Sequence, residues 1–158
     1  MNPKGFKAVL DRPSWSKDVV VWIGDGLGNV LEGTHHKVLD LLDLLPDDES
    51  LPSDREDRAD LLRRNLEQKL VELRPADSER AVLRVRNAAL LTRYGVGLQS
   101  FYDLFGGAQT LAVLEINRAK SVQLPGTVAG TIDFDPDWLV EYFKPLLAKP
   151  DNLCVEVE

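Results

Sequence analysis

The sequence predicts an α/β fold: a small, mostly parallel sheet with helices on its faces. Two observations lead to this prediction. Short apolar runs rich in β-branched residues, typical of buried strands, alternate along the chain with segments whose leucines recur every three or four residues, as in amphipathic helices. Strands that alternate with helices favour parallel pairing, because each helix returns the chain to the end of the sheet where the next strand begins.

The 158 residues are expected to form a single domain, 1–158, long enough to bury a core. The apolar content of 44% and charged content of 28% are ordinary for a soluble globular protein. We find no secretory signal pattern and no apolar run of about 20 residues, and Cys154 has no second cysteine to pair with. We therefore expect a cytoplasmic protein without membrane contact. The net charge of −7 argues against direct nucleic-acid binding, because the phosphate backbone would repel an acidic protein.

The first predicted elements surround a glycine-rich loop. Residues 1–17 are expected to form a short irregular or helical lead-in, and "DVVVWI" (18–23) a buried strand. "GDGLGN" (24–29) is predicted to be a loop or tight turn, with a β-hairpin to "NVLEG" as one form of it. "THHKVLDLLDLLP" (34–46) is predicted to be a helix that ends at its proline.

The clearest helix follows a polar segment, 46–54, that we interpret as a flexible connection within the domain. Ser53 and Glu56 have the spacing of a capping box, and Pro75 ends the helix. Its predicted buried side consists of Ala59, Leu62, Leu66, Leu70 and Leu73.

The second half of the chain is predicted to alternate shorter strands and helices. Asp135 is the expected N-cap of the last helix, which should bend or break at Pro145. The predicted elements are a strand at 80–85, helices at 88–95 and 98–107, a strand at 109–116, turns with one edge strand at 121–134, the last helix from 135, and a final strand at 152–157 within the C-terminal segment 135–158.

The glycine-rich loop fails the test for a triphosphate-binding loop. That motif, G-x-x-x-x-G-K-S/T, needs a lysine for the β and γ phosphates and a hydroxyl for Mg²⁺. Counting from Gly24, the sixth position is Asn29, the lysine position is Val30 and the hydroxyl position is Leu31. A nucleotide therefore lacks its main positive partner in this register.

The remaining patterns in the loop fail as well. A register starting at Gly28 places Thr34 where the lysine should be, and the dinucleotide pattern G-x-G-x-x-G lacks its third glycine. Asp25 would also repel phosphate. We interpret the loop as a turn or a vestigial site that binds no cofactor, formed by Gly24, Asp25, Gly26, Gly28 and Asn29.

A second requirement for phosphoryl transfer is a carboxylate for Mg²⁺ after a neighbouring strand. The candidate strand, 80–85, is followed by Arg86 and Asn87 instead. Since two independent requirements fail, we expect that the chain is not an ATPase.

The order of these motifs resembles the small P-loop-type protein of BREX phage-defence systems. The resemblance spans about residues 18–131 and rests on "GDGLGN", "RAVLRVRNAALL", "LFGGAQTLAVLEI" and a later turn with "GT". It implies a P-loop-like fold with a glycine-lysine-threonine motif near Gly24–Leu31 and an acid at Arg86, so this chain would be a degenerate member. Such a pseudoenzyme would act as a scaffold or adaptor, through protein-protein interaction, for a larger ATPase or methyltransferase in antiviral defence.

Two other functions stay open at this point. One is a regulatory subunit that binds NTP weakly and acts with a partner ATPase. The other is an immunity or inhibitor protein, which would use its acidic surface to mimic nucleic acid or to cover a basic enzyme.

Three arginines are candidates for an interaction surface. Arg80, Arg84 and Arg86 alternate along one strand and so share one face, although a central strand of an α/β sheet is normally apolar on both faces. The strand could lie at an edge, the arginines could pair with acids of the helix at 53–74, or they could meet an acidic partner.

The other polar residues have simpler interpretations. His35 and His36 are adjacent and not three or four apart, so no metal site is expected. The acids of "DFDPDW" (133–138) are interpreted as a helix start. The expected core aromatics are Trp15, Trp22, Trp138, Tyr142 and Phe143, with Trp138, Tyr142 and Leu146 on one side of the last helix.

Overall fold

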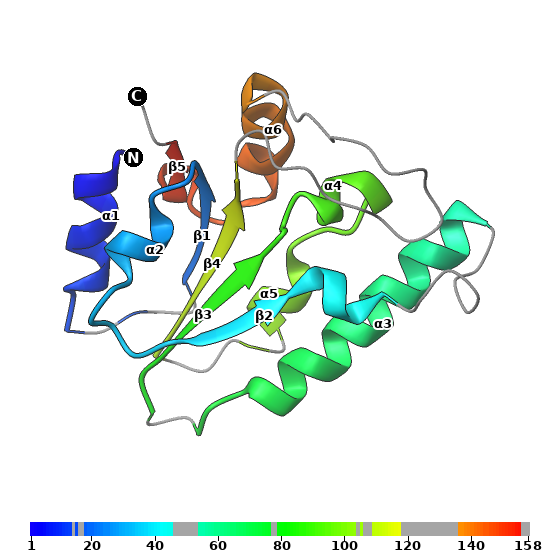
Figure 1. The fold of residues 1–158 in the computed structure, drawn as a ribbon, viewed down its shortest axis with the longest axis horizontal. Helices are drawn as coiled ribbons and strands as arrows, with labels where there is room; N and C mark the ends of the chain where they lie inside the picture. The colour runs from blue at the N-terminus through cyan, green and yellow to red at the C-terminus, as the bar shows by residue number, and fades with distance from the viewer. Residues whose placement is uncertain are drawn as a thin grey trace.

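A computed structural model describes residues 1–13, 15, 18–45, 54–76, 79–103, 105, 109–117 and 136–155. Its centre is a five-stranded sheet with the order β2-β3-β4-β1-β5, in which every pair of neighbours is parallel (Figure 1). The predicted α/β class with a parallel sheet is therefore confirmed. The strands are β1 (Asp18–Ile23), β2 (Lys37–Asp40), β3 (Ala81–Arg86), β4 (Thr110–Ile116) and β5 (Leu153–Val155).

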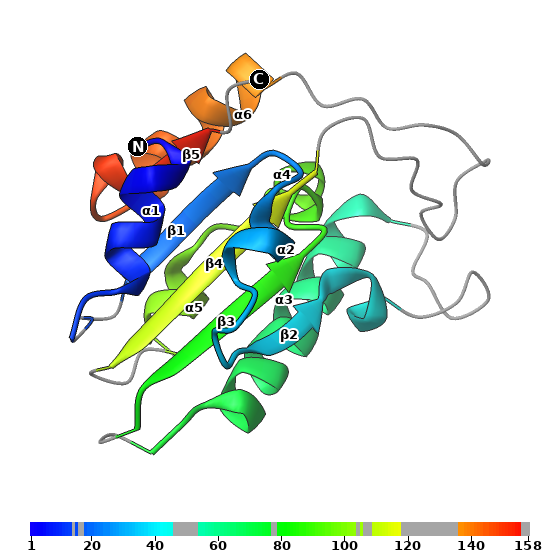
Figure 2. The same ribbon diagram turned by 60° about the vertical axis from the view of Figure 1, so that its left-hand side comes forward.

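Helices cover the two faces of this sheet. They are α1 (Pro3–Leu10), α2 (Leu27–Val30), α3 (Arg55–Leu73), α4 (Leu90–Tyr94), α5 (Gln99–Asp103) and α6 (Pro136–Phe143), with 3₁₀ turns at Leu41–Leu44, Lys144–Leu146 and Pro150–Asn152. Figure 2 shows α2 in front of the strands, with α3 and α5 behind them. We call the side that carries α3 to α6 the main face, and the side that carries α1 and α2 the second face.

The core is divided between these two faces by the alternation of side chains along each strand. On the main face, Leu83 and Val85 of β3 pack with Leu62, Leu66 and Leu70 of α3. On the second face, Val20 and Trp22 of β1 pack with α1, where Phe6 meets the Trp22 ring edge-on at 5.2 Å. Because β1 and β4 are buried along their whole length, their sequences are apolar apart from Asp18, Thr110 and Glu115 and show no alternation.

The direction of each crossover explains which face its helix occupies. The chain steps from β2 to β3 to β4, and then past β1 to β5, with α3 to α6 on the main face. The connection from β1 to β2 runs in the opposite direction across the sheet, and its helix α2 lies on the second face. Since crossovers between parallel strands are right-handed, a connection that runs in the opposite direction across the sheet places its helix on the opposite face.

The predicted helix at 34–46 is wrong. Its first half is strand β2, which pairs with β3 from Lys37 to Asp40, and its second half is a 3₁₀ turn. The Asp40 carboxylate accepts a hydrogen bond from the Leu42 amide at 3.0 Å and so starts the turn. Leucine spacing suggested a helix, but pairing with β3 supplies the backbone hydrogen bonds that a helix would otherwise make.

Two local predictions are also corrected. The suggested β-hairpin after residue 23 is absent from the described residues, because both neighbours of β1 are parallel strands and Leu27–Val30 is helical. The N-cap of α3 is Asp54, whose carboxylate accepts from the Glu56 amide at 2.8 Å. The predicted cap at Ser53 lies outside the described residues.

The other element predictions are confirmed within a residue or two, except that α5 ends at Asp103 whereas the predicted helix ran to residue 107. These are β1, α3 with its buried leucines, β3, α4, α5, β4, β5, a helical lead-in and a last helix that gives way to a 3₁₀ turn at Pro145. The predicted segment at 121–134, the Asp135 cap and most of the connection at 46–54 lie outside the described residues.

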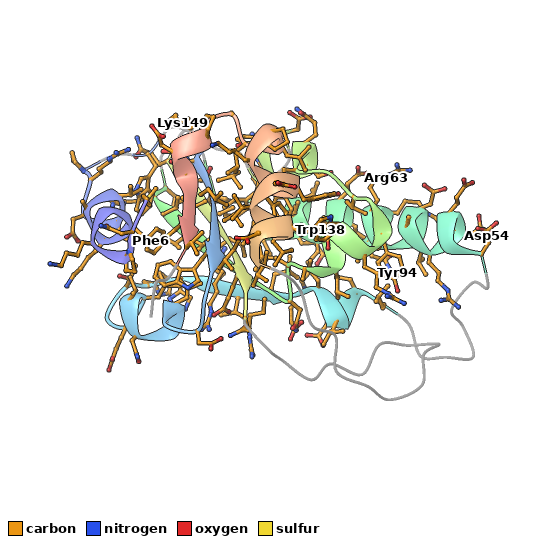
Figure 3. The ribbon with its side chains drawn as sticks, turned by 90° about the horizontal axis from the view of Figure 1, so that it is seen from above. Phe6, Asp54, Arg63, Tyr94, Trp138 and Lys149 are labelled. Carbon is orange, nitrogen blue, oxygen red and sulfur yellow. The ribbon has the colours of Figure 1, made fainter. Side chains whose placement is uncertain are left out.

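Helix α6 contains one exception to the predicted aromatic core. Trp15, Trp22 and Phe143 are buried as expected, but Trp138 is 47% exposed and Leu146 is also exposed. Figure 3 shows Trp138 on the outer part of α6. The Trp138 and Tyr142 rings lie 5.7 Å apart, and burial raises the pKa of the Tyr142 phenol.

Candidate functional site

The ends of β1 and β4 form the point at which this sheet reverses its winding. The two strands are neighbours, but the chain leaves β1 toward the second face and returns from β4 to the main face. In open α/β sheets, ligands bind outside the carboxyl ends of the strands at such a point. We call this region the carboxyl edge, formed by residues 24–26, 40, 86–87 and 117.

The glycine-rich loop lies at the carboxyl edge. Gly24 has a φ of +152°, which L side chains rarely adopt, and its amide donates to the Ile116 carbonyl at 2.9 Å. Nδ2 of the Asn117 side chain donates to the exposed Asp25 carboxylate at 3.4 Å. The loop is therefore fastened to the end of β4.

Helix α2, which follows the loop, is only four residues long and has no side-chain cap. Gly28 and Asn29 are both exposed, and a Cβ on Gly28 would lie 3.7 Å from Nη2 of Arg84, which is an ordinary van der Waals distance. Helix α2 therefore lies over Arg84 with room for a small side chain at position 28.

Arg84 and Glu115 form a bidentate ion pair between β3 and β4. Nε and Nη2 of Arg84 each donate to one oxygen of Glu115 at 2.9 Å. The Glu115 side chain is 1% exposed and that of Arg84 is 22% exposed. Two parallel hydrogen bonds satisfy the buried carboxylate, which would otherwise be costly to remove from water. The alternative that the arginines pair with acids of the helix at 53–74 is wrong, because α3 lies on the opposite face.

Arg80 is also held within the chain. Its guanidinium lies 3.7 Å from the centre of the Trp15 ring and donates to the Leu10 carbonyl at 2.8 Å. This arginine therefore ties the segment after α1 to the start of β3.

Arg86 differs from the other two arginines. It ends β3 at the carboxyl edge and is partly exposed. Its Nε is buried and has no hydrogen-bond partner, and no ion pair to the guanidinium is present among the described residues. Leaving a buried donor unsatisfied costs about 1–3 kcal/mol.

Two carboxylates flank Arg86, and both are engaged by other groups. Asp40 is its register partner on β2, but accepts from the Leu42 amide and, at 2.7 Å, from Nδ2 of Asn87. Glu115, on the other side, is held by Arg84. Asn87 itself has a φ of +58°, which turns the chain away from the strand directly after Arg86.

The three arginines share the second face, as their alternation predicts, but their strand is not at an edge of the sheet. β3 lies between β2 and β4, so the edge interpretation is wrong. What the sequence could not show is that Glu115 satisfies Arg84 and leaves Arg86 without a partner. The one signal for this was an acid in an otherwise apolar strand, "TLAVLEI".

The other predicted site residues do not come together. His35 is exposed, and Nδ1 of His36 lies 2.7 Å from the Thr34 carbonyl. Cys154 is buried in β5. Within the described part of the chain, no group of three or more histidines, cysteines and acids could hold a metal ion. The first half of "DFDPDW", residues 133–135, lies outside the described residues.

The same described part contains no helix that is both long and apolar enough to cross a membrane. No family model, curated protein or solved structure was found to match the chain.

Proposed function

We propose that this chain is a non-catalytic scaffold or adaptor of a multi-protein prokaryotic system, and that this system is a phage defence. It works in the cytoplasm and binds a larger protein, an ATPase or a methyltransferase. The sequence resemblance over residues 18–131 supports the type of system. The single observation that carries the adaptor role is a strip of the second face that the described helices leave open.

This open strip consists of Val38 on β2 and Arg86 on β3, and it borders Arg84, which lies under α2 and is partly covered by it. The buried cluster under α1 and α2 contains residues of β1, β3, β4 and β5, but among the described residues none of β2. Val38 is 52% exposed, whereas its neighbour Leu39 is buried on the main face. Parallel sheets normally have both faces covered, so an open strip on one face favours a partner as the missing cover.

The strip is also held rigid, which suits a docking surface. Arg84 is fixed by two hydrogen bonds to Glu115, and β2 and β3 pair over four consecutive residues of β2. A partner therefore loses little side-chain freedom at this surface when it binds. Covering Val38 would contribute about 1 kcal/mol, because roughly half of the side chain is already buried.

A photocrosslinking experiment in the native host tests the adaptor role. The photoreactive residue p-benzoylphenylalanine replaces Val38 in one strain and Val71 in another. Val71 is the matched control, since it is a valine of similar exposure, 58%, on α3 at the main face. We expect one discrete adduct with a larger protein from position 38 and none from position 71.

Two further variants make the test decisive. Val38→Asp should abolish co-purification of the crosslinked protein, while Val71→Asp should not, and thermal unfolding confirms that both fold. Equal adducts from both positions, or co-purification that survives Val38→Asp, would overturn the proposal. ATP or GTP binding at micromolar concentration, measured by calorimetry with Mg²⁺, would favour the nucleotide-binding alternative instead.

A further inference from the structure

We infer that Arg86 forms a binding site for an oxyanion, a phosphate or carboxylate group of a small molecule, at the carboxyl edge of the sheet. This inference goes beyond the adaptor role and does not depend on it, because the chain by itself can bind a small ligand at Arg86 without any partner. It rests on Nε of Arg86 in β3, for which the described residues supply no acceptor.

Arg84 shows how a guanidinium of this strand binds an oxyanion. Its Nε and Nη2 donate in parallel to the two oxygens of Glu115, both at 2.9 Å. This side-on fork is the geometry in which arginine recognises planar carboxylates and pairs of phosphate oxygens. Arg86 lies two residues further along the same face and carries the same fork, with Nε buried and unpaired.

The acids next to Arg86 make their hydrogen bonds to other groups, Asp40 through Oδ1 and Glu115 through both of its oxygens. Asp40 lies opposite Arg86 in the register and binds the Leu42 amide and Asn87. Glu115 is satisfied by Arg84. A buried donor without a partner requires an explanation in a folded protein, and a group supplied from outside is one that fits this geometry.

The position of Arg86 supports an external ligand. It ends a parallel strand whose neighbour β4 forms the winding reversal with β1, and ligands of open α/β sheets bind outside these strand ends. Trp22 also has a buried unpaired donor, Nε1, but the residue is fully buried. Arg86 is partly exposed, so an ion from solvent can approach its guanidinium, and pairing with the buried Nε requires the side chain to rotate toward the ion.

The test uses inorganic phosphate and acetate as probes, with chloride as the reference, each titrated into isotope-labelled protein at constant ionic strength. Two-dimensional NMR follows the Nε–H signal of Arg86 and the backbone amides of residues 86–88. We expect a saturable shift of these signals with phosphate, acetate or both, and none with chloride. A response to phosphate alone assigns a phosphate group, and a response to acetate alone assigns a carboxylate.

The matched variants are Arg86→Lys and Arg64→Lys. Lysine keeps the charge but lacks the fork, so Arg86→Lys should weaken oxyanion binding about tenfold. Arg64, an exposed arginine on α3, lies on the main face, and its replacement should leave binding unchanged. The dispersion of the amide spectrum reports whether each variant is folded.

Shifts that rise linearly in all three salts, or saturable shifts that persist in Arg86→Lys, would overturn the inference. Neither result affects the crosslink expected from position 38, so failure of the oxyanion site and failure of the adaptor role are distinguishable. If phosphate present during irradiation suppresses formation of the adduct at position 38, the inference is supported in a second way, since a partner's acidic side chain then competes with phosphate for Arg86.

Discussion

The ion pair between Arg84 and Glu115 gives the sharpest quantitative prediction. Replacing Glu115 by glutamine keeps its shape but removes its charge, so the Arg84 guanidinium loses its counter-charge and one of its two acceptors. Breaking a buried pair by removing one partner costs about 3–5 kcal/mol. Since 22% of the Arg84 side chain is exposed, water offsets part of this loss, and we expect about 2 kcal/mol.

The assay is urea unfolding followed by circular dichroism, with linear extrapolation to water. A loss of about 2 kcal/mol corresponds to a melting temperature lower by about 4–8 °C for a chain of this length. The second variant, Arg84→Met, and the double variant complete a thermodynamic cycle. The double variant should lose less unfolding free energy than the two single variants lose together. With both charged side chains removed, no buried charge is left without its partner.

Asp60 and Arg63 provide the matched control. They form an ion pair at 2.7 Å on α3, but both side chains are more than half exposed, so Asp60→Asn should cost less than about 0.5 kcal/mol. Figure 3 shows Arg63 at the outer surface of this helix. If Glu115→Gln costs no more than Asp60→Asn, then burial does not set the value of the pair and the reasoning fails.

Three further predictions concern the core, the glycines and alkaline pH. Leu66→Ala should lower the free energy of urea unfolding by about 2–5 kcal/mol, because the side chain is fully buried. Val71→Ala, at an exposed position of the same helix, should change it by less than about 0.5 kcal/mol. Similar losses in the two variants would contradict the assigned faces of α3. Gly28→Ala should raise the melting temperature, since the contact with Arg84 admits a Cβ and alanine favours a helix over glycine by about 1 kcal/mol. Gly95→Ala should lower the melting temperature, because Gly95 has a φ of +67° that strains an alanine. The raised pKa of Tyr142 contributes stability below about pH 10 that is lost as the pH rises through the folded-state pKa, because the unfolded chain loses its proton first. Tyr142→Phe should remove this part of the stability loss in alkaline unfolding, and an unchanged pH profile would contradict it.

Local patterns predicted most of the elements but failed where pairing overrode them. The apolar runs of β1 and β4 and the leucine spacing of α3 are signals that burial itself imposes, so they were visible in the sequence. Strand β2 is only four residues long, and its leucines continue into a 3₁₀ turn. Its identity comes from pairing with β3, more than 40 residues later, which no local pattern records.

The candidate site divides in the same way. The alternation of Arg80, Arg84 and Arg86 determined that they share one face, because the period of a strand is two residues. Only the strand order decided that β4 lies beside β3 and brings Glu115 to Arg84, 31 residues away in sequence. The register likewise placed Asp40 beside Arg86. The Asp40 carboxylate, however, accepts its hydrogen bonds from the Leu42 amide and from Asn87, which belong to the turns after the two strands. Sequence therefore determined which side chains face the same way, and the tertiary structure decided which charges are satisfied, because ion pairing depends on contacts between strands that the chain order does not fix.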